Sequence, residues 1–160
     1  MKMRLRYTIM VCFVVLATSC TKETYVGETG IVPEAENDRI VEQELLSVIN
    51  DHRLALGYNA LDYSSEAQKY ADQHNDYMIS KGSLSHDNFS SRASSLSSEL
   101  NAEFVAENVA KDYTNATEAF EGWLQSSNHK KTMEGEFTHT AVSVKKDASG
   151  NYYFTQLFFR

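Results

Sequence analysis

The residues in this sequence that are best suited to chemistry are a few histidines and one glutamate. His86 lies in the polar segment Ser85–His86–Asp87, and His129 follows a polar stretch after the only tryptophan. Glu107 interrupts the apolar run 104–110, where a carboxylate is costly to bury unless it is paired, hydrogen-bonded or metal-bound. Imidazole and carboxylate groups bind metals and transfer protons near neutral pH. Taken singly, each of these residues is also typical of a solvated histidine or an ion-paired glutamate.

The remaining histidines and nearby serines are weaker candidates. His52 and His74 lie on the apolar faces of predicted helices, so we expect partly buried, structural histidines. His139 lies at the start of a predicted strand, where its side chain could face a site or solvent. A serine hydrolase needs a serine activated by a neighbouring histidine, and Ser85 and Ser126 are the nearest in sequence. Nothing in the sequence indicates that either serine is activated.

Hydrophobic spacing predicts the elements that must position these residues. Apolar residues at helical spacing predict three helices, and alternating or aromatic runs predict three strands. Ser65 followed by Gln68 is typical of a helix-capping box, and Asn115 is expected to cap a later helix. Helices early in the chain and a hairpin at its end predict an α+β layered domain. The expected elements are helices over 40–56, 65–81 and 116–124, a short helix over 89–100, strands over 102–110, 137–145 and 151–159, a loop over 59–62 and a hairpin turn over 147–150.

The N-terminus has the features of a bacterial lipoprotein signal. Basic residues are followed by a mostly apolar run over 8–18, which is shorter than the ~20 residues of a transmembrane helix. The run ends in Ala17–Thr18–Ser19–Cys20, which resembles a lipobox. We therefore predict a signal peptide over 1–19 and a lipid on Cys20. The alternative is an ordinary secretory signal with an incidental cysteine.

Cysteine usage and charge limit the classes of function. Loss of Cys12 with the signal and acylation of Cys20 would leave the domain without a free cysteine, which excludes disulfides, thiolate metal sites and a cysteine nucleophile. The formal charge is −7, and loss of Lys2, Arg4 and Arg6 makes it more negative. An acidic domain repels nucleic acid and anionic lipid, so we expect no nucleic-acid partner and membrane attachment through the lipid.

The segment between the lipid and the domain reads as a tether. Residues 20–38 are polar, contain the only proline and show no apolar periodicity, so we expect a lipid anchor and flexible linker. A strand through Ile31 and Val32 is the alternative. The globular domain is expected over 39–160. The protein should then be held by its lipid in a bacterial cell envelope, on the extracytoplasmic side, facing the periplasm or the cell surface.

Five motifs occur in an order that matches one known family. In chain order they are His86; Ala106–Glu107–Asn108; Trp123 followed by Ser126–Ser127–Asn128–His129; Phe137–Thr138–His139; and Tyr153–Phe154–Thr155–Gln156–Leu157–Phe158. On these motifs the chain resembles the CAP superfamily, the SCP-like domains shared by cysteine-rich secretory proteins, antigen 5 and pathogenesis-related 1 proteins. The resemblance covers about residues 40–160 and is greatest to the compact bacterial branch without disulfides.

The resemblance implies a three-layer α-β-α sandwich with a central antiparallel sheet. It also implies an open cleft lined by two histidines, His86 and His129, and by up to two glutamates. Glu107 matches the first glutamate, whereas Ser126 occupies the position of the second. Ala106 and Ala141 replace two glycines of the family pattern, and both replacements look tolerable for the fold.

Several functions are compatible with this set of residues. Two imidazoles and a carboxylate match a zinc ligand set, and the resemblance implies a weakly held divalent metal at His86 and His129 with Glu107 nearby. The same groups could act as acid and base, or could hydrogen-bond to each other structurally. We expect a non-enzymatic module that binds an unidentified small-molecule, lipid, glycan or protein ligand through His86, Glu107 and His129, with His139 ranked lower. The alternatives are a metal-dependent or acid-base hydrolase of peptide or cell-envelope material, and a domain that only holds partners.

Overall fold

The computed structural model describes residues 35–160. The predictions for the signal peptide, for Cys20 and for most of the tether therefore lie outside the described residues. Within them, no helix has the length and apolar character needed to cross a membrane. The elements are α1 (Arg39–Ala55), β1 (Asp62–Tyr63), α2 (Ser65–Lys81), α3 (Phe89–Leu100), β2 (Val105–Lys111), α4 (Ala116–Gln125), α5 (Ser127–Met133), β3 (His139–Lys146) and β4 (Tyr152–Phe159).

Polar caps fix where the long helices begin. Asn115 caps α4 as predicted, because its side chain accepts a hydrogen bond from the Glu118 amide. The predicted cap of α2 is wrong by one residue. Ser64, rather than the predicted Ser65, accepts from the amide of the third residue of the helix, and Gln68 turns inward to donate to a carbonyl of β3. Gln68 is therefore a core residue rather than part of a cap.

The four strands form one sheet in the order β1-β3-β4-β2. The hairpin β3–β4 is antiparallel, and β2 runs antiparallel to β4 along its other side. The predicted loop over 59–62 is partly wrong, because Asp62 begins the two-residue strand β1, which pairs in parallel with β3. A two-residue strand is too short to leave a periodic signal in the sequence. The predicted α+β class is confirmed, with its three long strands antiparallel.

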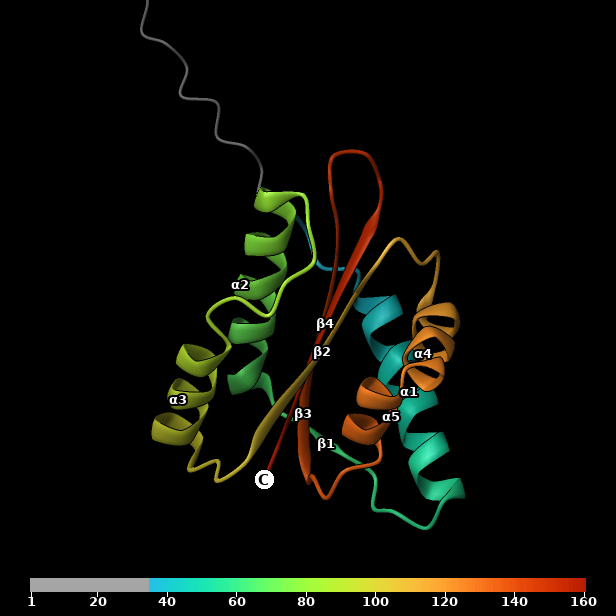
Figure 1. Ribbon diagram of the computed structural model, residues 1–160, viewed down its shortest axis with the longest axis vertical. Coiled ribbons are helices and arrows are strands. Elements are labelled where there is room, and N and C mark those ends of the chain that lie inside the picture. The colour runs from blue at the N-terminus through green and yellow to red at the C-terminus, as the bar shows by residue number, and fades with distance from the viewer. Residues whose placement is uncertain (1–34) are drawn as a thin grey trace, which may run out of the picture. The chain divides into compact units, whose positions relative to one another are not determined.

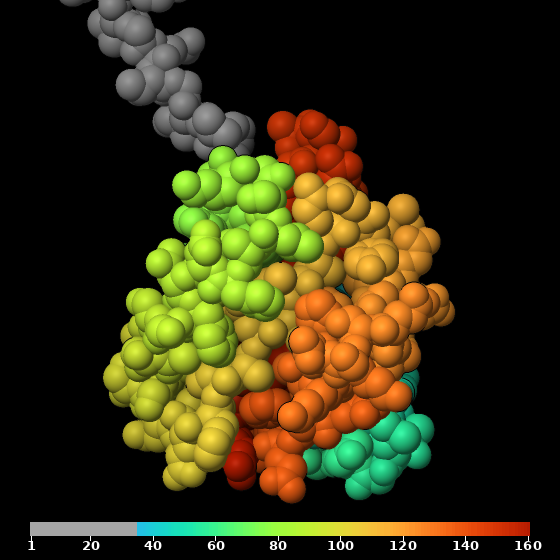
Figure 2. Space-filling view, in the orientation of Figure 1, coloured from blue at the N-terminus to red at the C-terminus, as the bar shows by residue number. Residues whose placement is uncertain are grey.

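Helices cover both faces of the sheet and make the predicted three layers (Figure 1). α2 and α3 pack on one face, and α1, α4 and α5 pack on the other. Because β2 ends the strand order, its outer edge has no strand beside it. Atoms of β2 are visible at the surface, along the seam between the two helical layers (Figure 2).

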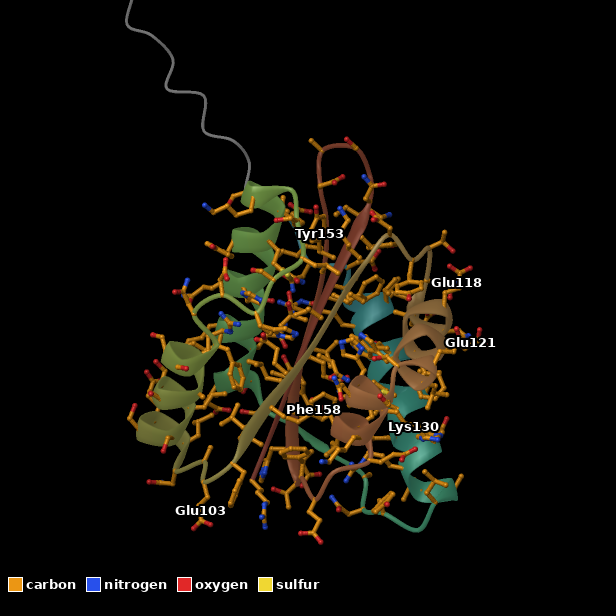
Figure 3. All side chains as sticks on the ribbon, viewed as in Figure 1. Glu103, Glu118, Glu121, Lys130, Tyr153 and Phe158 are labelled. Carbon is orange, nitrogen blue, oxygen red and sulfur yellow. The ribbon has the colours of Figure 1, made fainter. Side chains whose placement is uncertain are left out.

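Burial on both faces explains the aromatic β4. All eight of its residues are buried, with alternate side chains entering the two cores. Tyr153 packs with Met78 of α2, whereas Phe158 joins the core that α1 and α4 cover. In Figure 3 both lie within the sandwich, whereas Glu118, Glu121 and Lys130 project from its outer surface. The sheet is thus a rigid base for the side chains carried by β2.

Candidate functional site

The edge strand β2 directs its side chains to both helical layers in turn. The Glu107 carboxylate meets Arg92 of α3 on one face of the sheet. Its neighbour Asn108 points to the opposite face, where its side-chain amide donates to the backbone carbonyl of His129 on α5, at 3.1 Å. The strand therefore contacts two distant chain segments, one on each face of the sheet.

The Glu107 carboxylate is held by three donors. Arg92 makes two charge-assisted bonds, from Nε to Oε2 and from Nη2 to Oε1, both of 2.8 Å. His86 Nδ1 lies 2.8 Å from Oε1, and His74 Nε2 lies 3.7 Å from the same oxygen. Burial alone would raise the pKa of Glu107, but the bonds from His86 and Arg92 outweigh burial and lower it. Glu107 is therefore an ionised carboxylate, and both of its oxygens accept hydrogen bonds.

His86 is oriented by this carboxylate. An ionised carboxylate can only accept, so Nδ1 of His86 carries the proton of their shared hydrogen bond. In the neutral ring, Nε2 then has a free lone pair. The side chain is 52% exposed, although its partner Glu107 is almost fully enclosed. His86 can thus present Nε2 to a ligand, an arrangement in which the carboxylate acts through the imidazole.

His129 lies on the opposite side of β2. Its ring is tilted against Trp123 with 6.5 Å between centroids, and it is partly buried. Burial, followed by the nearby charge of His86, lowers the pKa of His129. The lowered pKa keeps the His129 ring neutral at physiological pH.

His139 is not brought to the other three residues. It stacks on Phe159 with 5.3 Å between ring centroids, and its Nδ1 lies 2.8 Å from the Thr138 hydroxyl. The side chain is exposed where β3 begins. None of its contacts in residues 35–160 involves His86, Glu107 or His129.

Two participants were not predicted as site residues. Arg92 is nearly buried and also donates to the Asp87 carbonyl, so it links α3, the His86 loop and Glu107. Its only sequence signal is a position one turn before the buried Leu96, within a serine-rich helix. His74 is buried as predicted, but its Nε2 also hydrogen-bonds the Ser85 carbonyl beside Glu107. Burial lowers the pKa of His74, which keeps its ring neutral.

The other polar candidates serve the fold. His52 is half-buried, with Nε2 2.9 Å from Glu134 and its ring edge-on to Phe120. Ser126 occupies the N-cap position of the unpredicted helix α5 without a side-chain capping bond, and the mostly polar sequence of α5 has no apolar period. The hydroxyl of Ser85 accepts from the Asp87 amide. Within the described residues, neither serine hydroxyl hydrogen-bonds a histidine, so neither shows the activation that a nucleophile needs.

The donor set does not fit a metal site that includes Glu107. A zinc ligand must offer an accessible lone pair, whereas the Glu107 side chain is 1% exposed and both its oxygens already bond the Arg92 guanidinium. Across residues 35–160, no cluster of three or more His, Cys, Asp or Glu side chains is placed to hold a metal ion. The two imidazoles of His86 and His129 are the donors that this site leaves for a cation.

Comparison with known proteins identifies the family. Residues 46–158, more than half of the chain, match the model of the cysteine-rich secretory protein (CAP) family. The chain belongs to this family, as its motif order predicts. A search of curated proteins finds no match.

Solved structures of bacterial proteins share this fold. An outer surface protein of Borrelia burgdorferi is 18% identical with a TM-score of 0.71, covering 79% of this chain and 96% of its own. An extracellular protein of Bacillus anthracis with an SCP domain is 23% identical, with a TM-score of 0.67 over 76% of this chain and 41% of its own. A cysteine-rich secretory protein of Staphylococcus aureus is 17% identical, with a TM-score of 0.66 over 78% of this chain and 39% of its own. This chain thus spans about two fifths of the latter two proteins.

Proposed function

We propose that this protein is a lipid-anchored, extracytoplasmic binding module that holds its ligand at His86 and His129 without turning it over. The observation that carries the proposal is the state of Glu107. Its carboxylate is enclosed, ionised and bonded to Arg92 and His86. Glu107 and Arg92 therefore act as a positioning pair that fixes the His86 ring.

A binding role suits these groups better than hydrolysis does. An acid-base catalyst works best with a pKa near the working pH and a free position for the proton. Glu107 has a lowered pKa, its enclosed oxygens already bond Arg92 and His86, and the described residues include no activated serine at the site. The exposed Nε2 of His86 and the neutral ring of His129 are able to accept or donate hydrogen bonds to a ligand.

The proposed location draws on the sequence and the comparisons together. The basic start, apolar run and Cys20 are ordered as in a lipoprotein signal. The structural neighbours include an outer surface protein and an extracellular protein. An acidic domain gains little from an anionic lipid surface, so the lipid on Cys20 is the proposed attachment to the cell envelope, with the site facing the periplasm or the medium.

The histidine ring signals of the purified protein provide a direct test. We would record them by NMR during titration with separate pools of peptides, glycans and lipids. One pool should shift the signals of His86 and His129 but not those of His139. His86→Ala should weaken binding at least about tenfold, as expected for one lost hydrogen bond, and His139→Ala should not. Equal effects of the two variants, no shift with any pool, or the appearance of reaction products would contradict the proposal.

Zinc serves as a second probe of the same site. Calorimetry of the protein should show at most weak zinc uptake, because only the two imidazoles remain as donors. Uptake at this site should disappear in the His86→Ala, His129→Ala double variant and persist in His139→Ala. Equal, weak uptake by all three proteins would end the idea of a metal between the two imidazoles. Tight uptake abolished by Glu107→Gln would contradict the positioning role of Glu107.

A further inference from the structure

The hydrogen-bond register shows which backbone groups of β2 face outward. Phe104 and Arg160 exchange both of their backbone hydrogen bonds, and the Asp112 amide donates to Tyr152 at 3.1 Å. In an antiparallel pair, residues that bond the partner strand alternate with residues that point away from it. The even-numbered residues of β2 therefore bond β4, and the odd-numbered residues Val105, Glu107 and Val109 direct their N–H and C=O groups to the free edge.

Most of these outward groups have no partner in the protein. Trp123 Nε1 donates to the Val109 carbonyl at 3.1 Å, so this outward carbonyl already has a partner. Within the described residues, β2 pairs with β4 alone, and no side chain hydrogen-bonds the N–H or C=O of Val105 or Glu107, or the N–H of Val109. Polar backbone groups of this kind need water or a ligand as their partner.

The free edge is most exposed at Val105, and it narrows along the strand, where Glu107 and Val109 are 8% and 6% exposed. The Glu107 side chain is 1% exposed, whereas the whole residue is 8% exposed, so its remaining exposure lies in the main chain. Val105 is half-buried, and Figure 2 shows atoms of β2 along the seam between the helical layers. A ligand that reaches His86 and His129 therefore meets backbone donors and acceptors spaced two residues apart.

A cavity beside this edge offers room for one side chain. It has a volume of about 360 Å³ and lies on the α5 side of the start of β2. Ala106 lines it, so a residue paired alongside Ala106 in an added strand would point its side chain to the same face. The cavity walls include Phe104 and Phe137, with the Arg160 guanidinium stacked on Phe104 at 4.4 Å. The lining also includes the polar or charged Lys131, Thr132 and Glu136, so the apolar contacts open to a side chain are those with Phe104, Ala106 and Phe137.

We infer that the ligand of this site is an extended peptide segment of a partner protein, which adds to the free edge of β2 as a further strand. The inference rests on the proposed binding function and names its ligand class. A peptide presents N–H and C=O groups at the strand repeat, which matches the run from Val105 to Val109. Glycans and lipids have no such repeat. An apolar side chain of the segment occupies the cavity between Phe104 and Phe137.

The first test uses a pool of capped random heptapeptides as the probe. Individual binders should shift the ring signals of His86 and His129 and protect the Glu107 amide from hydrogen exchange. The same peptides with alternate amides N-methylated should fail to bind, because methylation removes the donors. Unchanged binding of the methylated peptides would overturn the inference, and this comparison needs no variant of the protein.

Two proline variants give a matched test on the protein side. Val105→Pro removes an outward N–H from the unpaired part of the β2 edge. Lys111→Pro removes an outward N–H that lies beyond the Val109 carbonyl, which already accepts from Trp123. Proline is tolerated at such outward positions of edge strands. Val105→Pro should weaken peptide binding about tenfold, the effect of one hydrogen bond, and Lys111→Pro should not. Equal binding by Val105→Pro and wild type would overturn the inference.

The pools also separate the two proposals. If a glycan or lipid pool shifts His86 and His129 while peptides do not, the peptide inference is wrong and the binding module stands. If no pool shifts either ring, the proposed function itself fails.

Discussion

Glu42 and Glu107 are two buried glutamates, 6% and 8% exposed, in opposite chemical surroundings. Glu107 receives two bonds from a nearly buried arginine and one from His86, and its pKa is lowered although burial opposes this. Burial raises the pKa of Glu42 and outweighs its hydrogen bonds from Asn37, the Val144 amide and Arg39. A carboxylate in a core stays ionised when a buried cation faces it.

The difference separates two uses of a buried carboxylate. Glu42 accepts bonds from Asn37 and from the Val144 amide of β3, so it ties the start of α1 to the sheet edge opposite β2. Its cationic partner Arg39 is 57% exposed and therefore well screened by water. Glu107 instead accepts a hydrogen bond from His86 Nδ1 and so orients the His86 ring. Glu42 holds α1 against the sheet, and Glu107 orients a side chain of the candidate site.

Removal of Arg92 should have the largest effect of any single change in this comparison. Arg92→Ala leaves the Glu107 charge buried without its main partner, so we expect a loss of about 3–5 kcal/mol in the free energy of unfolding. Urea denaturation measures it. The double variant Arg92→Leu, Glu107→Leu should recover most of the loss, because it removes both charges. A loss below about 1 kcal/mol in Arg92→Ala would show that the pair is not the main support of Glu107.

Glu107→Gln should destabilise the protein in a pH-dependent way. The folded state lowers the pKa of Glu107, so its contribution is present above the unfolded value of about 4.3 and is lost as pH falls through the lowered folded value. We expect Glu107→Gln to cost about 1–3 kcal/mol near neutral pH and much less in acid. Urea titrations at both pH values test this. A pH-independent difference from wild type would contradict the ionised state of Glu107.

Glu42→Gln should show the opposite pH dependence with a smaller size. The folded state raises the pKa of Glu42, so its contribution is present below about pH 4.3 and is lost as pH rises through the raised folded value. Relative to wild type, Glu42→Gln should therefore gain stability from acid to neutral pH, by about 1 kcal/mol or less. The same urea titrations measure this gain. If the stability of Glu42→Gln relative to wild type changed with pH in the same direction as that of Glu107→Gln, the two glutamates would not differ in ionisation.

Arg39→Ala should have the smallest effect. Exposed ion pairs contribute about 0–1 kcal/mol, and Arg39 is the exposed counterpart of Arg92. Denaturation with and without added salt is the measurement, because salt screens an exposed pair. A loss as large as that of Arg92→Ala would show that burial of the cation does not decide the outcome.

The sequence predicts best where a pattern repeats over several turns or residues. The helices α1, α2 and α4 and the strands β2, β3 and β4 have such patterns, and each forms within a few residues of its predicted range. β1 and α5 were missed because one is two residues long and the other is a short helix with Met133 as its one apolar residue. Neither leaves a periodic signal that sequence reasoning could detect.

The sequence points to Glu107 as a site residue but not to Arg92 and His74, which lie beside its carboxylate. Glu107 stands out because a carboxylate in an apolar run demands a partner. That partner is Arg92, 15 residues away on another element, and only the tertiary fold selects it. For the same reason His139 falls outside the cluster although it belongs to an ordered motif: the start of β3 places it beside Phe159.

The tautomer of His86 tests the central claim most directly. Nitrogen-15 NMR of the neutral imidazole reports which ring nitrogen carries the proton. If the ionised Glu107 orients His86, the proton lies on Nδ1 and Nε2 is bare, ready for a ligand. Glu107→Leu should abolish this preference and Glu42→Gln should leave it intact. A wild-type His86 protonated on Nε2 would contradict the account.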